Sequence, residues 1–188
     1  MHSGLRRCGV LVLSMLLSSC ISAPQAVVAT NQSLPLLSPA SLSASHQVNQ
    51  VLHGEYAGKS FSLRCVVTVD ALKLSVICLT GMGMRAFTLT YDGKNLSEQR
   101  APQVPDSLQA SRLLNNLQLA FWPLSELQKS WVGAGLQVTE PYPGTRRVMH
   151  DGKVIVEVHY SNDPWQGRVW LDQNELGYGL FIESSAME

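Results

Sequence analysis

The stretch FSLRCVVTVDALKLSVICLT, residues 61–80, determines the fold class because apolar and polar side chains alternate on both sides of a short break. Its apolar positions are Phe61, Leu63, Cys65, Val67 and Val69, followed by Leu74, Val76 and Cys78. Alternation with a period of two is typical of a β-strand with one buried face. The stretch therefore predicts two strands joined by a turn at Ala71 and Leu72.

The two cysteines of this stretch lie opposite each other if the strands form a hairpin. The same register pairs Val69 with Leu74 and places the apolar residues of both strands on one face. Opposed Cβ atoms lie about 4.5–5.5 Å apart, and a disulfide needs about 3.5–4.5 Å. The spacing of Cys65 and Cys78 fits neither a C-x-x-C motif nor a zinc site. We therefore favour a disulfide over two buried thiols.

Further strands are predicted on both sides of a central region. They are Arg85–Tyr91, 94–100, 146–150, Lys153–Tyr160, 168–172 and 176–183. Asp92-Gly93 and Asp151-Gly152 are strong hairpin-turn signals. The sequence thus predicts seven or eight antiparallel strands.

The central region has helical periodicity instead. Its apolar positions recur at steps of three and four: Ala110, Leu113, Leu114, Leu117, Ala120 and Phe121. Pro105 suits the first turn of a helix. Pro123 interrupts the pattern, and Leu124–Trp131 predicts a second, shorter helix before Gly133 and Gly135.

This order of elements predicts a mainly β fold of the α+β class. A sheet with one apolar face must cover that face, and two short helices cover a flat sheet poorly. We therefore expect a curled antiparallel sheet that forms an open half-barrel with a two-helix lid. The concave side either encloses a cavity or is filled by side chains. The candidate cavity or lid residues are Leu113, Leu117, Phe121, Trp122, Trp131 and Trp165.

The N-terminal segment predicts export. Arg6 and Arg7 precede the apolar run GVLVLSMLL, which is shorter than the about 20 residues of a membrane-spanning helix. This order is typical of a signal peptide, and the string LSSC resembles the lipobox of bacterial lipoprotein precursors. The resemblance implies cleavage after residue 19 and lipidation of Cys20. Because Ile21 is not the aspartate that retains lipoproteins in the inner membrane, it also implies a lipid anchor in the outer membrane, facing the periplasm.

Three segments are therefore expected: a signal peptide at 1–19, a lipidated cysteine with a flexible tether at 20–51, and a single open-barrel domain at 52–188. The tether is rich in Ser, Ala, Pro, Gln and Asn. Leu34, Leu36 and Leu37 could dock on the domain, but we favour a flexible spacer. The 14 basic and 14 acidic residues cancel without a basic run, so no nucleic-acid-binding face is expected.

Signals for catalysis are sparse. The sequence contains no G-x-S-x-G nucleophile elbow, phosphate-binding glycine loop or metal-ligand cluster. Glu157 and His159 share one strand face, but a third partner is missing, so we favour a structural role for this pair. We expect no catalytic residues, no metal and no cofactor.

Three phrases resemble a family of uncharacterised proteobacterial lipoproteins: LQLAFWP (residues 117–123), RRVMHDGKVIVEVHY (146–160) and DPWQGRVWL (163–171). The resemblance extends over the whole domain. It implies an association with aryl polyene biosynthesis and a fold similar to the carriers LolA and LolB, which hold lipoprotein acyl chains in an incomplete barrel. It implies no catalytic residues.

These observations favour a non-enzymatic carrier or receptor for a lipid-like cargo, with aryl polyene lipid as a candidate. The expected partners are the membrane, through the N-terminal lipid, an acyl-chain ligand, and envelope export or Lol-type proteins. An envelope-assembly scaffold is the alternative, and a lipid hydrolase or acyltransferase is less favoured.

Overall fold

The computed structural model describes residues 34–187, apart from residues 57, 103 and 105–108. Its main element is one sheet of ten antiparallel strands in the order β5-β4-β3-β2-β1-β10-β9-β8-β7-β6. The terminal strands β5 and β6 do not pair with each other, so the sheet is not closed. The predicted signal peptide, Cys20 and the first part of the predicted tether lie outside the described residues.

The strands are β1 (His46–Tyr56), β2 (Lys59–Val69), β3 (Leu74–Thr80), β4 (Arg85–Tyr91), β5 (Leu96–Arg100), β6 (Leu136–Tyr142), β7 (Thr145–His150), β8 (Lys153–Tyr160), β9 (Arg168–Gln173) and β10 (Tyr178–Ala186). The α-helices are α1 (Ala110–Phe121) and α2 (Leu124–Trp131), and the 3-10 helices are η1 (Pro39–Ser41), η2 (Val132–Ala134) and η3 (Pro164–Gln166).

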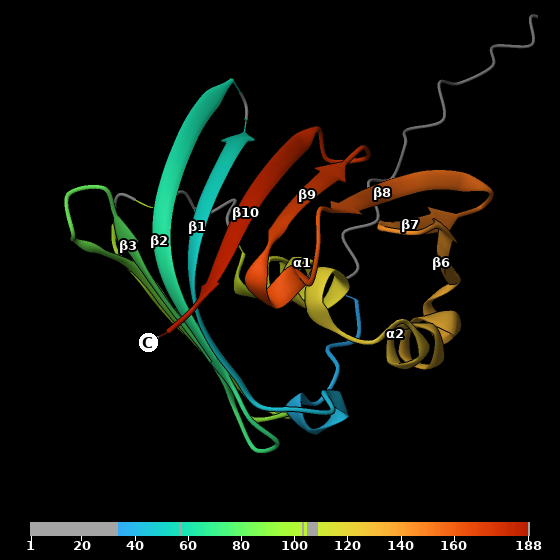
Figure 1. Cartoon of the computed structure of the whole chain (residues 1–188), viewed down its shortest axis with the longest axis horizontal. Helices are drawn as coiled ribbons and strands as arrows, with labels where there is room; N and C mark the ends of the chain where they lie inside the picture. The colour runs from blue at the N-terminus through green and yellow to red at the C-terminus, as the bar shows by residue number, and fades with distance from the viewer. Residues whose placement is uncertain (1–33, 57, 103, 105–108, 188) are drawn as a thin grey trace, which may run out of the picture.

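The sheet consists of two meanders joined at their first and last strands. Strands β1 to β5 pair in chain order, as do β6 to β10, and β1 pairs with β10 at the centre. The helices connect the two meanders and lie on the concave side of the curved sheet (Figure 1). The expectation of a mainly β, open antiparallel sheet with two helices is confirmed.

The predicted register of the hairpin formed by β2 and β3 is also confirmed. Val69 pairs with Leu74, and Cys65 pairs with Cys78. The turn is held by Asp70, whose Oδ1 accepts hydrogen bonds from the backbone N–H groups of residues 72 and 73. The structure joins the two cysteines in a disulfide with their Cα atoms 4.1 Å apart.

Removing this disulfide is expected to destabilise the domain. Since the bonded cysteines are 13 residues apart, the double variant Cys65→Ala/Cys78→Ala should lose about 3 kcal/mol of unfolding free energy. The measurement is urea unfolding of residues 20–188 with Cys20→Ser, produced under oxidising conditions, with and without a reductant. Reductant should lower the stability of the parent and leave the double variant unchanged. Two titratable thiols in the folded, unreduced parent would contradict the assignment.

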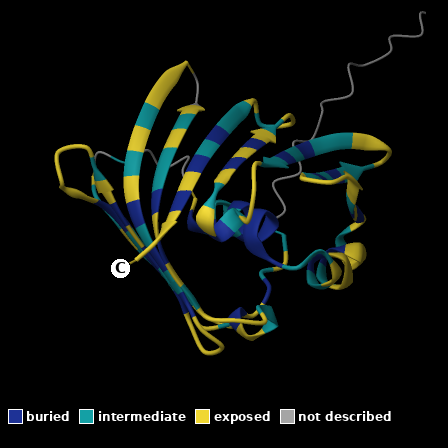
Figure 2. Cartoon of the chain, in the orientation of Figure 1, coloured by how far each residue is buried: buried dark blue, intermediate teal, exposed yellow. Residues whose placement is uncertain are grey.

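The core lies on the concave face of the sheet, where alternate residues of neighbouring strands point inward. Figure 2 shows this alternation as bands of buried and exposed residues along the strands. Val67, Leu74, Leu89 and Leu171 are at most 1% exposed. The inward direction of these side chains follows from the period-two patterns in the sequence.

Two of the ten strands were not predicted. In β1 the inward positions include Gln50 and Gly54, which interrupt the apolar pattern. A Cβ at Gly54 would overlap the ring of Phe61, so a larger residue there would have to displace that ring. In β6 the short pattern contains Glu140 and Pro141; proline is tolerated because β6 is an edge strand.

The prediction that residues 34–51 belong to a flexible tether was wrong. Strand β1 begins at His46, and the preceding residues pack on the core. We call residues 34–42 the strap. Leu37 of the strap is 5% exposed, and its N–H and C=O groups both bond to the side-chain amide of Gln118, at 2.9 and 2.7 Å. These paired contacts, together with burial of the leucine, fix the strap against α1.

The helix α1 also differs from the prediction of a lid. Its residues are buried on several sides, including the polar Asn115, Asn116 and Gln118. It therefore lies within the concave space of the sheet rather than only over the opening (Figures 1 and 2).

Candidate functional site

An apolar cavity of about 40 Å³ lies between α1 and the concave face of the sheet. We call it the apolar cavity. It is lined by Leu113, Leu114, Asn116 and Leu117 of α1, and by Gln50, Leu52, Cys65, Val76, Cys78, Phe87, Leu89, Leu180 and Ile182 of the sheet. The predicted candidates Leu113 and Leu117 thus lie in its wall, and the disulfide lies on the sheet side.

A second cavity, of about 100 Å³, lies on the other side of α1. We call it the mixed cavity because apolar and polar residues line it. The apolar residues are Leu34, Leu119, Trp131, Ala134, Leu136, Val148, Ile155, Val156 and Leu176; the polar ones are Gln109, Ser111, Arg112, Asn115, Asn116, His150, Gln173 and Glu175. The helix α1 therefore separates two spaces of different chemistry.

Asn116 lies in the wall of both cavities. Its Nδ2 donates to the hydroxyl of Tyr178 at 2.7 Å, and its Oδ1 accepts from Nε2 of Gln173 at 2.8 Å. This hydrogen-bonded group fixes the middle of α1 to β9 and β10. Asn116 is therefore part of the wall that the two cavities share.

The predicted aromatic candidates lie in the core. Trp122 is 1% exposed and its indole N–H donates to Oγ of Ser41 at 2.9 Å. Trp131 is 0% exposed and donates to the carbonyl of Pro35 at 3.0 Å. The sequence predicted both tryptophans as cavity or lid residues, and in the structure the strap covers both. Of the two, only Trp131 lines a cavity, the mixed one.

Phe121 and Trp165 form part of an aromatic stack. The ring centroids of Phe121 and Trp165 are 4.6 Å apart. The ring of His46 also stacks on Trp165, with the two centroids 4.1 Å apart. Burial lowers the pKa of His46, and the nearby Asp163 partly opposes that effect. The stack joins the end of α1 to the start of β1 and lines neither cavity among the described residues.

The C-terminal end of α1 is held by Arg146, which is 7% exposed. Its Nη1 donates to the carbonyls of Leu119 and Trp122 at 2.5 and 2.9 Å, and its Nε and Nη2 donate to Glu140. Its guanidinium also lies 5.6 Å from the ring centroid of Tyr160. Burial raises the pKa of Tyr160 to about 12, although Arg146 opposes the shift. A cation at this end of a helix compensates the partial negative charge there.

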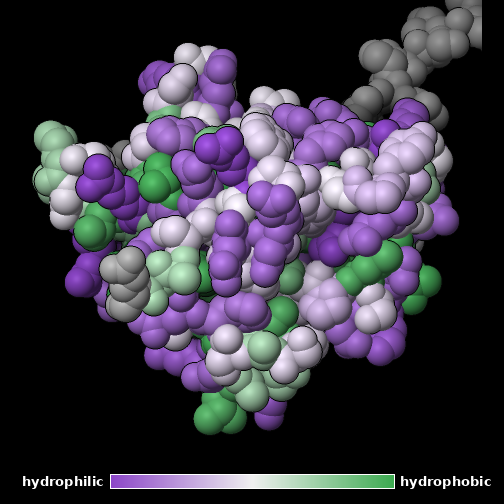
Figure 3. Space-filling model, in the orientation of Figure 1, coloured by the Kyte–Doolittle hydropathy of each residue, from purple (hydrophilic) through white to green (hydrophobic). Residues whose placement is uncertain are grey.

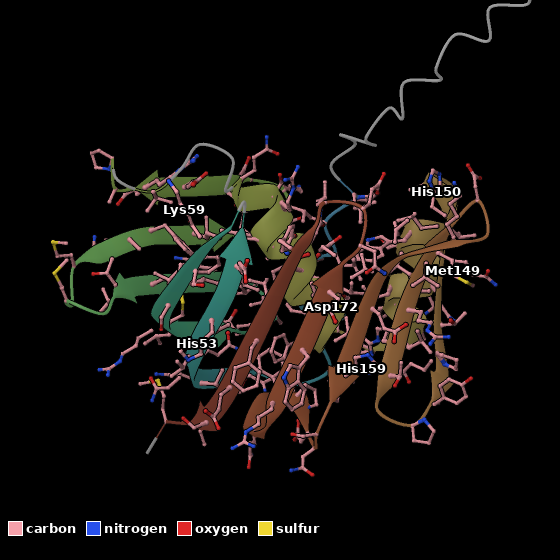
Figure 4. All side chains as sticks on the ribbon, turned by 90° about the horizontal axis from the view of Figure 1, so that it is seen from above. His53, Lys59, Met149, His150, His159 and Asp172 are labelled. Atoms are coloured by element: carbon pink, nitrogen blue, oxygen red, sulfur yellow. A yellow bond between two sulfur atoms is a disulfide. The ribbon has the colours of Figure 1, made fainter. Side chains whose placement is uncertain are left out.

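Glu157 and His159 lie on the outer face of the sheet, away from both cavities. Figure 4 shows this face, with His159 and Asp172 labelled and the helices behind the strands. Glu157 bonds to Arg147 at 2.5 Å and to His159 at 2.9 Å. The hydrogen bond from Arg147 is the main reason that the pKa of Glu157 is lowered. The arrangement is that of a cross-strand ion pair.

A third, open hollow of about 630 Å³ lies near the same side of the sheet and is lined by Glu55, Gly58, Glu157, Asp172, Gln173, Asn174, Gly177, Tyr178 and Gly179. Within the described ranges, no three His, Cys, Asp or Glu side chains are placed to hold a metal ion. In the same part of the chain, no helix is both long and apolar enough to cross a bilayer.

Exposed apolar side chains include a group at β3 and the turn that follows it, namely Ile77, Leu79, Met82 and Met84. Leu72 and Met82, at 80% and 81% exposed, lie in the turns that follow β2 and β3. Figure 3 shows apolar residues on one face as separate patches among hydrophilic ones. The cavities beside α1 differ from this surface because they lie between α1 and the sheet and are lined by core residues.

The fold and its cavities define a class of protein in which an open antiparallel sheet curves around an inner helix, with an apolar space on one side and a mixed one on the other. The chain belongs to the family described as a protein of unknown function, DUF3261, whose model matches residues 47–186. The comparison with curated proteins gave no match. The family description names no activity, ligand or location, so the lipoprotein and aryl polyene expectations stay proposals.

The buried polar residues in and around the two cavities were not predicted from the sequence; they include Gln50, Asn115, Asn116, Gln118 and Arg146. A signal for three of them exists: residues 113–124 contain no charged side chain, although polar residues occur among the leucines. A helix whose polar residues are all uncharged is suited to burial on more than one face.

Proposed function

We propose that this protein is an exported outer-membrane lipoprotein that binds a lipid-like hydrophobic cargo between α1 and the concave face of the sheet. The apolar cavity beside Leu113 and Leu117 carries the proposal, because its lining is almost entirely apolar. Burial of each methylene group in such a site contributes about 0.8 kcal/mol. An acyl or polyenyl chain therefore needs no polar contact in order to bind there.

The size of the cavity requires α1 to move when cargo binds. At about 40 Å³ it is much smaller than the about 150 Å³ of an engineered cavity that holds benzene. Among the described residues, the side-chain hydrogen bonds that join α1 to the rest of the fold involve Asn116 and residues beyond it, including Gln118 and Leu119. Leu113 and Leu117 have apolar side chains that pack without such bonds. We therefore expect the N-terminal end of α1 to move outward.

The rest of the proposal follows from the sequence. The signal peptide and Cys20 support attachment to the outer membrane on its periplasmic side. The resemblance to LolA and LolB supports a carrier that holds acyl chains in an incomplete barrel, and the association with aryl polyene biosynthesis suggests the polyene lipid as cargo. Lol-type or other envelope export proteins would then deliver or receive that cargo.

A scaffold for envelope assembly is the second candidate. It is favoured by one observation, that α1 already occupies most of the concave space and leaves only small cavities. A scaffold needs no bound lipid and no movement of α1. The two candidates therefore differ in whether lipid accompanies the folded protein.

Native mass spectrometry of the exported chain with Cys20→Ser, purified from a periplasm, tests the carrier. We expect bound lipid in the parent protein, or uptake of added oleic acid. Leu117→Glu should abolish binding, because a carboxylate in the wall of the apolar cavity opposes entry of a chain. Leu117 is half-buried, so the variant should still fold.

Leu124→Glu is the matched control. Leu124 is also a half-buried helical leucine that packs on the core, but it lines neither cavity. This variant should retain bound lipid. A parent protein that carries no lipid and takes up none on incubation would rule out the carrier and favour the scaffold.

A further inference from the structure

The mixed cavity contains a buried polar group without a protein partner. Asn115 is 8% exposed and lines this cavity, and its Oδ1 accepts no hydrogen bond from the described residues. Buried polar atoms in folded proteins nearly always have a partner. The other two unpaired atoms, in Thr80 and Thr88, line neither cavity, so Asn115 is the one that a ligand could reach.

The polar residues around Asn115 are mostly uncharged. Gln109, Ser111 and Gln173 offer amide and hydroxyl groups, His150 an imidazole, and Arg112 and Glu175 one charge of each sign. The charges of Arg112 and Glu175 cancel. The other polar side chains can exchange hydrogen bonds with hydroxyl groups of a ligand. The chemistry therefore favours an uncharged, hydroxylated ligand over an anionic one.

We propose that the mixed cavity binds the uncharged, hydroxyl-bearing head group of an amphiphile, such as the glycerol group of a monoacylglycerol, while the acyl chain lies in the apolar cavity. This inference rests on the proposed function. Asn116 lies in the wall of both cavities, and the outward movement proposed for the N-terminal end of α1 would join the two cavities beside it. A hydroxyl donates a hydrogen bond to Oδ1 of Asn115, whereas an ionised carboxylate has no proton to donate.

The size of the mixed cavity limits the head group. Its volume is about 100 Å³, and a cavity of about 150 Å³ holds benzene. Glycerol has as many non-hydrogen atoms as benzene and is more compact when folded. A head group of this size fits with small adjustments of the rim, and a disaccharide does not.

The test compares monolaurin with lauric acid, which share one acyl chain and differ in the head group. Affinities for both are measured by calorimetry on the exported chain with Cys20→Ser. Asn115→Leu preserves the side-chain size and removes the hydrogen bonds. It should weaken monolaurin binding about tenfold and leave lauric acid binding nearly unchanged. Leu117→Glu, in the apolar cavity, should weaken both ligands.

A second readout comes from stability without ligand. Because Asn115→Leu removes a buried amide oxygen that accepts no hydrogen bond from the described residues, the ligand-free variant should melt at nearly the temperature of the parent. If Asn115→Leu does not fold, Asn115→Ala, which removes the same amide, replaces it in both measurements. If a folded variant weakens the binding of both ligands equally, or of neither, the head-group assignment is overturned. The proposal that the protein carries a lipid is not affected by that result. If the parent binds neither probe, the proposed function fails together with it.

Discussion

A chain that begins at residue 46 is expected to lose about 5 kcal/mol of unfolding free energy relative to one that begins at residue 20. Removal of the strap exposes the contact surface of Leu37, worth about 2 kcal/mol. It also leaves the indole N–H groups of Trp122 and Trp131 and the amide of Gln118 without their partners, at about 1–3 kcal/mol for each group that stays buried. Such a loss is a large fraction of the stability of an ordinary domain.

Urea unfolding of three chains measures this effect. Residues 20–188 with Cys20→Ser are the reference, and residues 34–188 are the matched control, because they retain every strap contact. Residues 46–188, close to the limits of the family match, form the test chain. Equal stability of the two shorter chains would show that the strap contributes nothing.

The hairpin of β2 and β3 shows what the sequence can predict. Its strands have one buried face, and a shift of one residue would turn every apolar side chain outward. Only one register combines the turn at Asp70 with apolar pairs such as Val67 and Val76. Local pattern was sufficient because the partner strand lies next in the sequence.

Strand β1 shows why local pattern fails elsewhere. Its inward position at Gln50 is filled by a polar side chain, whose Nε2 donates to Oγ of Ser184 on β10. Both residues are buried and lie 134 positions apart. Neither polar residue alone predicts a core position; only their pairing makes burial favourable.

The strap was misjudged for a related reason. The indole groups of Trp122 and Trp131 are satisfied by Ser41 and Pro35, in a segment whose composition is typical of a flexible linker. An amphipathic ring at a helix end suits an exposed boundary as well as a buried site with one hydrogen bond. The choice between them depends on contacts that cross most of the chain, and composition does not contain this information.

The variant Arg146→Met should be among the most destabilising single substitutions, at about 2–4 kcal/mol, because it leaves two buried carbonyls without a donor. Methionine retains much of the apolar length of the side chain but donates no hydrogen bond. The carbonyls of Leu119 and Trp122 lose a donor in a buried place, and Glu140 loses its ion-pair partner. The negative end of the α1 dipole also loses its adjacent cation.

Arg147→Met is the matched control, because the next residue of β7 points to the opposite face of the sheet. Arg147 bonds to Glu157 on the outer surface, where an ion pair contributes little, so the control should unfold almost as the parent does. Arg146→Lys should be intermediate, since one ammonium group cannot reproduce the planar set of donors that contacts two carbonyls and a carboxylate. Thermal unfolding of the three variants decides the matter. Equal losses of stability in Arg146→Met and Arg147→Met would mean that Arg146 does not hold α1 in place. The movement proposed for cargo binding needs a fixed C-terminal end of α1, so that result would count against it as well.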